Sequence, residues 1–438
     1  MAGGATFLGG AKGRLLAPSI PFRFFATAVL FQCLGWLTLL WAAPAVPGFV
    51  GGLGGPLAAL HLMTLGVLVM TAIGASLQLL PVASRQAPVA SRRPYDLVWS
   101  LYTMGVVGVC SGMAFVVPGV LAAGALAVAV ALLVYLALLA RNLRGAKGMP
   151  LVVVHGWAAC LSLLVLLGSA LALAGAYNGL ALLDRQSAIS LHVSFAAYGF
   201  MGLLVMGFSY ILVPMFALSD NPAPRWAHLS LALALLALVL AALVSLGLLP
   251  QSYWRGGLAA GALAFAIHAA LMLQALRTGM RQRLGKPFWL VRLGWALLGA
   301  SLLAALALDV ELLGVRGPVL FGVLLVGGLL TLLLGMLSRI VPFLASMHAG
   351  AGMRRPPTAS KLTAQRPLDL HFYSHVSALL LLLTALLLDS VWLVRASAAV
   401  GLFGAVAFGV FFVTTWRRMT QSLAPNPAPE TLKTKDLR

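Results

Sequence analysis

The sequence predicts an all-α, polytopic membrane protein with about 12 transmembrane helices. Of its 438 residues, 61% are hydrophobic and only 9% are charged, whereas soluble domains carry about 25% charged residues. A soluble globular fold is therefore excluded. Apolar runs of about 20 residues, the length that crosses a bilayer, recur along the chain. They lie at residues 22–42, 57–80, 97–117, 119–140, 151–175, 189–217, 228–249, 257–276, 288–308, 318–338, 370–388 and 396–416.

The distribution of basic residues supports this number of helices and predicts their orientation. If the N-terminus is cytoplasmic, 25 of the 29 Lys and Arg residues fall in segments on the cytoplasmic side. Because cytoplasmic loops are enriched in Lys and Arg, we expect both termini in the cytoplasm. The formal charge of +20 therefore reflects the orientation of the chain in the membrane. We predict that the lipid bilayer is a partner and that nucleic acid is not.

The predicted domain organisation is one membrane domain, residues 1–420, followed by a disordered cytoplasmic tail, residues 421–438. The first apolar run follows basic residues, as a signal peptide would. It is longer than the apolar region of about 7–15 residues in a signal peptide, so we interpret it as a membrane helix. The 3 cysteines have no spacing typical of a disulfide framework or a thiolate metal site.

The second, sixth and tenth predicted helices end in a related pattern, which predicts an internal repeat. In each, a proline follows a glycine by seven residues, and the copies are separated by 133 and then 128 residues. We therefore expect three four-helix units with pseudo-threefold symmetry, at residues 22–140, 151–276 and 288–416. Glycine lets helices approach closely, and we expect proline to end each helix near polar side chains. The glycine–proline pairs are Gly74 and Pro81, Gly207 and Pro214, and Gly335 and Pro342; the polar candidates are Gln78, Tyr210 and Arg339.

His61 and His192 are the strongest candidates for a cofactor site, because polar groups at membrane depth are functional by default. They lie 13 residues before Gly74 and 15 before Gly207, so the repeat would place them at similar depth. Two neutral imidazoles at one depth can ligate a haem iron axially or hold copper. Nearby methionines, such as Met63, are either soft ligands or packing residues.

The other histidines are weaker candidates. His371 and His375 are four residues apart, so both imidazoles share a helix face and could chelate one metal; the alternative is that they lie at the membrane interface. His268 is in the middle of a predicted span and needs a partner. His155 and His228 open their helices, where a histidine ordinarily lies at headgroup level. All carboxylates lie at or beyond the span ends, and we predict no catalytic residues.

The helix containing His61 to Pro81 and the helix containing His192 to Phe216 resemble subunit I of the haem-copper oxidase superfamily. The resemblance covers all spans in topology, but only three helices at residue level. It implies that His61 ligates haem b and that His192 ligates copper. It also implies a bacterial inner membrane location, with respiratory-complex subunits or a second copy of the chain as partners.

Departures from that family exclude a complete oxygen-reducing centre. The helix at residues 228–249 should carry two adjacent copper-ligating histidines, but holds only His228, at its inner end. Residues 318–338 should carry two haem-ligating histidines and contain none. Ala196 replaces the tyrosine expected four residues after the copper-ligating His192. The chain resembles an oxidase scaffold with most catalytic residues removed, as in nitric-oxide-response membrane proteins.

Two functional hypotheses follow. The first is a haem- or copper-binding membrane protein that acts in electron transfer, gas or metal handling, or assembly of a respiratory complex. The alternative is a transporter of a small uncharged or anionic solute without a redox cofactor. Abundant glycine and the inner-facing Arg339 beside Ser338 favour the transporter, whereas a parallel repeat is unlike the inverted units of common carriers.

Overall fold

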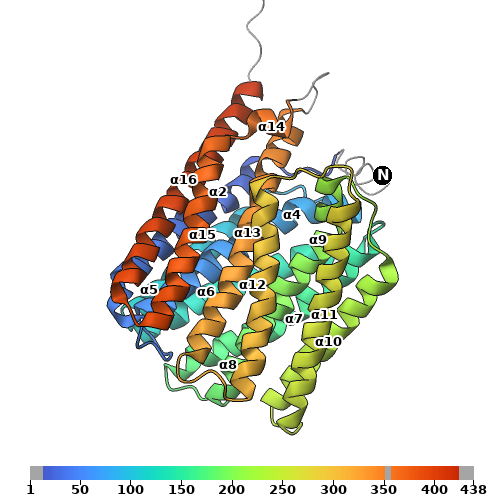
Figure 1. The fold of residues 1–438 in the computed structure, drawn as a ribbon. Helices are drawn as coiled ribbons and strands as arrows, with labels where there is room; N and C mark the ends of the chain where they lie inside the picture. The colour runs from blue at the N-terminus through green and yellow to red at the C-terminus, as the bar shows by residue number, and fades with distance from the viewer. Residues whose placement is uncertain (1–12, 351–356, 424–438) are drawn as a thin grey trace, which may run out of the picture.

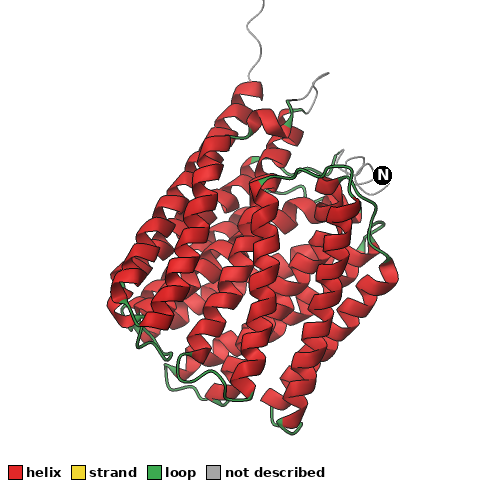
Figure 2. Ribbon diagram, viewed as in Figure 1, coloured by secondary structure: helices red, strands yellow, loops and turns green. Residues whose placement is uncertain are grey.

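The structure is a computed structural model that describes residues 13–350 and 357–423. Within these residues the regular secondary structure is entirely helical, and 12 helical stretches are long and apolar enough to cross a membrane. Short connections join them at the two ends of the bundle (Figures 1 and 2). The predicted fold class and number of spans are therefore confirmed.

The helical elements agree with the predicted spans to within a few residues at most ends. Helix α13 is the main exception, because it continues well past the predicted end at residue 338. Helix α16 takes in residues 421–423 of the predicted tail, and the rest of that tail lies outside the described residues. The elements are α2 (Ser19–Trp41), η1 (Ala43–Ala45), α3 (Gly55–His61), η2 (Leu62–Val69), α4 (Met70–Ser84), α5 (Arg93–Ala114), α6 (Pro118–Arg144), α7 (Pro150–Ala176), α8 (Arg185–Val193), η3 (Ser194–Gly202), α9 (Leu203–Ala217), α10 (Pro224–Ser245), α11 (Ser252–Thr278), α12 (Lys286–Asp309), α13 (Gly317–Ala349), α14 (Ala359–Leu362), α15 (Gln365–Leu388) and α16 (Val391–Leu423).

Proline marks where many of the spans begin. At the first helical positions its missing N–H costs nothing, and its fixed φ suits the helix. The uncharged break after residue 115 is one such place: Val116 has φ 56°, and Pro118 then opens α6, so residues 97–117 and 119–140 are separate helices as predicted. The prolines at the starts of spans are Pro56, Pro94, Pro118, Pro150, Pro224, Pro287 and Pro318.

The expectation that proline ends the repeat helices is wrong. Pro81 and Pro214 lie inside α4 and α9, which end three residues later at left-handed C-cap residues. Pro342 lies inside α13, which continues to Ala349. Membrane helices tolerate an internal proline because neighbouring helices and local adjustments satisfy the freed backbone groups.

Two of the three repeat helices share an unusual internal construction. In the second span, α3 passes into the π-helical element η2 and then into α4; in the sixth, α8 passes into π-helical η3 and then into α9. The final α-helix has 15 residues in both spans, and Gly66 of η2 lies 133 residues before Gly199 of η3. Helix α13 is an uninterrupted α-helix.

Contacts between helices link the predicted units in a ring. The last helix of each unit packs against the first helix of the next: α6 against α7, α11 against α12, and α16 against α2. Both π-helical elements contact α13, so the second, sixth and tenth spans meet inside the bundle. These contacts favour three units, whose symmetric arrangement stays a prediction.

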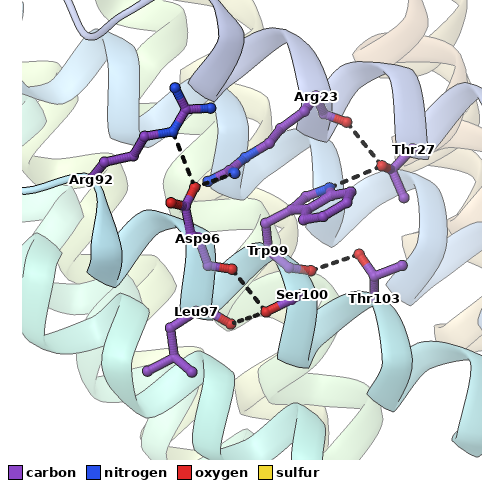
Figure 3. Close-up of polar contacts among 8 residues, drawn as sticks. All are labelled: Arg23, Thr27, Arg92, Asp96, Leu97, Trp99, Ser100 and Thr103. Atoms are coloured by element: carbon purple, nitrogen blue, oxygen red, sulfur yellow. Dashed lines mark hydrogen bonds and ion pairs between the residues drawn. The ribbon is translucent and has the colours of Figure 1, made fainter.

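The two described ends of the chain lie at the same end of the bundle (Figure 1). We call this the basic end; it includes the loops at residues 85–92, 145–149 and 279–285. Arg23 and Arg92 both pair with Asp96 there, and Trp99 donates a hydrogen bond to Thr27 (3.0 Å) (Figure 3). These contacts join α2 to α5 at the membrane surface.

Candidate functional site

His61 is held by its own helix. It is the last residue of α3, and its Nδ1 lies 3.0 Å from the Leu57 carbonyl oxygen. An Nδ1–H that donates to this carbonyl fixes the tautomer and leaves Nε2 with a free lone pair. Such an arrangement, in which one ring nitrogen is anchored, is typical of histidines that ligate metals.

His192 lies one residue before the end of α8. The helix begins at Asp184, whose carboxylate accepts hydrogen bonds from the Ser187 backbone N–H (2.9 Å) and hydroxyl (3.1 Å). These bonds hold the pKa of Asp184 below its ordinary value. The His192 Nδ1 is buried and has no hydrogen-bond partner among the described residues.

The fold brings His61 and His192 together. Their ring centroids are 6.3 Å apart, and the ring planes are inclined by 26°. Both side chains lie near the end of the bundle opposite the basic end. The π-helical element η2 begins directly after His61, and η3 begins two residues after His192. The predicted similar depth of the two imidazoles is thus observed, while their role as ligands stays a prediction.

The separation of the two rings leaves room for one metal ion. The rings are stacked, so a shared ion with metal–nitrogen bonds of about 2.0–2.1 Å would require their nitrogens to turn toward each other. Unliganded aromatic pairs also occur at about 4.5–7 Å, so the distance allows a metal without requiring one.

A third protein ligand is not apparent at this pair. No group of three or more His, Cys, Asp or Glu side chains able to hold a metal occurs within residues 13–350 and 357–423. The Met63 side chain lies against Gly35 of α2, as a packing residue does. The pair can therefore supply at most two imidazole ligands, a number that a haem iron can accept from the protein in addition to its porphyrin nitrogens.

A second polar cluster, not predicted from the sequence, joins α7, α9 and α11. Tyr210 packs edge-on between His155 and His268, with ring centroids 5.4 Å and 5.0 Å away. His155 is fully buried, and His268 is 2% exposed. The partner that His268 needed is thus an aromatic ring.

This cluster contains several unpaired polar atoms. His155 Nδ1 bonds to the Leu151 carbonyl (2.7 Å), but its Nε2 and both ring nitrogens of His268 have no partner among the described residues. The Tyr210 hydroxyl lies near Ser230, whose own hydroxyl donates to the Ala264 carbonyl, and it completes no well-formed hydrogen bond. Buried polar groups are normally paired, so these four atoms mark a polar spot in an apolar bundle.

His371 and His375 share a helix face as predicted, with ring centroids 5.6 Å apart. Both are buried between helices rather than exposed at the interface. His371 Nδ1 lies 3.0 Å from the Gly404 carbonyl, and His375 Nε2 lies 2.8 Å from the Thr331 hydroxyl. Each imidazole of the pair thus has one ring nitrogen engaged by a neighbouring helix, and the pair ties α15 to α13 and α16.

The remaining candidates contact nearby backbone. The Gln78 carbonyl oxygen accepts from the Leu16 N–H (3.2 Å), while its amide nitrogen is buried and unpartnered in the described part of the chain. Arg339 donates to the Leu284 carbonyl and so holds the loop before α12. His228 is exposed, with its Nδ1 2.8 Å from the Pro224 carbonyl.

The 12 long apolar helices of the described residues define a polytopic membrane protein. The chain matches no known protein-family description, and a search of curated proteins finds no match either.

Proposed function

We propose that this membrane protein binds one metal centre, haem b or copper, between His61 and His192, on a scaffold like that of haem-copper oxidase subunit I. The observation that carries the proposal is the pairing of these two imidazoles, 6.3 Å apart, from helices far apart in the sequence. The proposed roles are electron transfer, gas or metal handling, or assembly of a respiratory complex in a bacterial inner membrane.

The number of ligands narrows the role. If His61 and His192 both held a haem, the haem would supply one-electron transfer rather than gas binding. Copper held by two imidazoles alone keeps positions free for a further ligand. The protein's contribution is to hold His61 through Leu57 and to keep both side chains half-buried beside each other.

The direct test is loading of the purified full-length chain with haem or with Cu(I). We expect a Soret band and sharp α-band after reduction with dithionite, or one bound copper per chain by elemental analysis. His61→Ala and His192→Ala should each remove the signal. His228→Ala is the matched control, because that histidine is exposed at the basic end.

Two results would reject the metal centre. One is a chain that binds neither haem nor copper under loading conditions, and the other is binding that survives both alanine substitutions. Stabilisation of such a metal-free chain by a small solute would instead support the transporter.

A further inference from the structure

A cavity of about 250 Å³ lies at the basic end, between α4, α5, α6 and the loop after α4. This volume is below the 300–1,000 Å³ typical of sites for drug-sized ligands, so the cavity suits a small group. It lies at the C-terminal end of α4, whereas His61 is near the other end of the same span. Its lining residues with polar side chains are Ser76, Gln86, Tyr95, Arg141 and Asn142.

Two donors on the last turns of α6 face this cavity without a protein acceptor. Arg141 lines the cavity and forms no hydrogen bond or ion pair with any described residue. The Asn142 side-chain oxygen accepts from the Ser84 hydroxyl (2.6 Å), which directs its amide N–H groups away from that bond, and these N–H groups have no partner in the described part of the chain. A guanidinium and an amide that line one cavity can both donate to the oxygens of a phosphate or carboxylate.

The charges around the cavity are not balanced by acidic side chains. None of the lining residues is a carboxylate. The nearest acidic residue along α5 is Asp96, which is already shared by Arg23 and Arg92 (Figure 3). Arg141 therefore leaves a net positive charge at the rim of the cavity, where its side chain is also exposed to solvent.

Hydrogen bonds hold the walls of the cavity in place. The Gln86 amide donates to the Gly145 carbonyl, and the Lys147 N–H donates to the Ser84 carbonyl (2.8 Å), so the loops after α4 and α6 are joined. Tyr95 donates to the Val89 carbonyl (3.2 Å). At the inner end, the hydroxyls of Ser76 and Tyr135 are 2.7 Å apart. A site with fixed walls loses little entropy when it binds a ligand.

We propose that this cavity binds a small oxyanion of the phosphate type, with Arg141 and Asn142 as its donors. The anion has two sources at a membrane surface: the headgroup of an anionic phospholipid, or a free cytoplasmic phosphate. Basic pockets between membrane helices bind such headgroups. The enrichment of Lys and Arg in cytoplasmic loops orients the chain, but it does not explain why two donors line a cavity.

The test uses the full-length chain in nanodiscs and compares wild type with Arg141→Gln and Arg144→Gln. Arg144 is on the same helix, one turn further along, and is exposed outside the cavity lining, so both variants remove one charge. One arm adds phosphatidylglycerol to phosphatidylcholine nanodiscs. The other adds sodium phosphate to pure phosphatidylcholine nanodiscs, against sodium chloride of equal ionic strength. Thermal unfolding measures stabilisation, and native mass spectrometry measures retained lipid.

We expect at least one arm to stabilise the wild type, with binding about ten- to a hundredfold weaker in Arg141→Gln and unchanged in Arg144→Gln. A response to phosphatidylglycerol alone identifies a headgroup site, and a response to phosphate alone identifies a soluble anion; both support the proposal. Asn142→Asp keeps the acceptor for Ser84 but adds a carboxylate beside Arg141, and should also abolish binding. No stabilisation in either arm, or equal losses in the two arginine variants, would overturn the proposal.

Discussion

Gly207 of α9 packs directly on His155 of α7: a Cβ at Gly207 would lie 2.7 Å from the His155 Cβ. This contact sets the distance between the fifth and sixth spans where Tyr210 meets His155. The same relationship holds one unit earlier, where a Cβ at Gly74 would lie 2.7 Å from the Phe24 Cβ of α2.

Replacing Gly207 should separate these helices. We expect Gly207→Ala to lower the free energy of unfolding by about 1–3 kcal/mol, the usual cost of overpacking, as measured by denaturant unfolding in detergent micelles. Gly168→Ala is the control, because nothing lies within 4 Å of a Cβ at Gly168 of α7; it should stabilise by about 0.5–1 kcal/mol. Equal effects of the two substitutions would show that the contact does not set the spacing.

His268 should be replaceable by an apolar residue without loss of stability. Its two ring nitrogens are buried and unpaired within the described residues, and replacing an unsatisfied polar group by an apolar one of similar shape is nearly neutral or stabilising. We expect His268→Leu to unfold within about 1 kcal/mol of wild type. Tyr210→Ala should cost about 3–5 kcal/mol, as other aromatic truncations do. A large loss in His268→Leu would show that the imidazole has a bound partner in solution.

The stability of the first turn of α8 should depend on pH. Because the Ser187 N–H lowers the pKa of Asp184, the cap stabilises the helix above the unfolded pKa of about 3.9, and this stabilisation is lost as pH falls through the lower folded value. We expect Ser187 amide protection, measured by hydrogen exchange and corrected for intrinsic rates, to be high at pH 7 and reduced near pH 3. Asp184→Asn keeps an uncharged cap, so its protection should not change across this range.

Replacing Leu218 by glycine should stabilise the protein. It caps α9 in the left-handed region with φ 57° and ψ 46°, where a side chain clashes and glycine does not. We expect Leu218→Gly to raise the free energy of unfolding by up to about 1 kcal/mol. Leu218→Ala removes the same side chain but keeps the strained backbone, so it should give no such gain; a gain in both variants would assign the effect to the leucine side chain.

Much of the fold follows from local properties of the chain. Apolar length predicts each span, and proline predicts where helices such as α6 and α7 begin. The π-helical elements could not be predicted, because residues 62–69 and 194–202 have the same apolar character as the α-helices beside them. The continuation of α13 past Pro342 depends on neighbouring helices, which the sequence pattern does not describe.

The candidate site was predicted only in part. The repeat spacing placed His61 and His192 at one depth, and the structure pairs them. The cluster of His155, Tyr210 and His268 was missed because its members are more than 50 residues apart. In addition, a helix that is apolar on all sides does not show which of its faces packs against a neighbouring helix. The position of Tyr210, three residues after the repeat glycine Gly207, was the sequence feature that could have indicated the cluster.

The π-helical elements also bear on how the chain arose. A π-helical segment is a helix that has absorbed extra residues without losing its ends. If the second, sixth and tenth spans descend from one ancestral helix, the shared insertion after His61 and near His192 is most simply older than the split between those two copies. Helix α13, which lacks it, then either branched off earlier or lost the extra residues together with any equivalent histidine. In the register that aligns Gly66 with Gly199, His61 aligns with Ser194 rather than with His192, so a shared irregular turn would not by itself account for the two histidines.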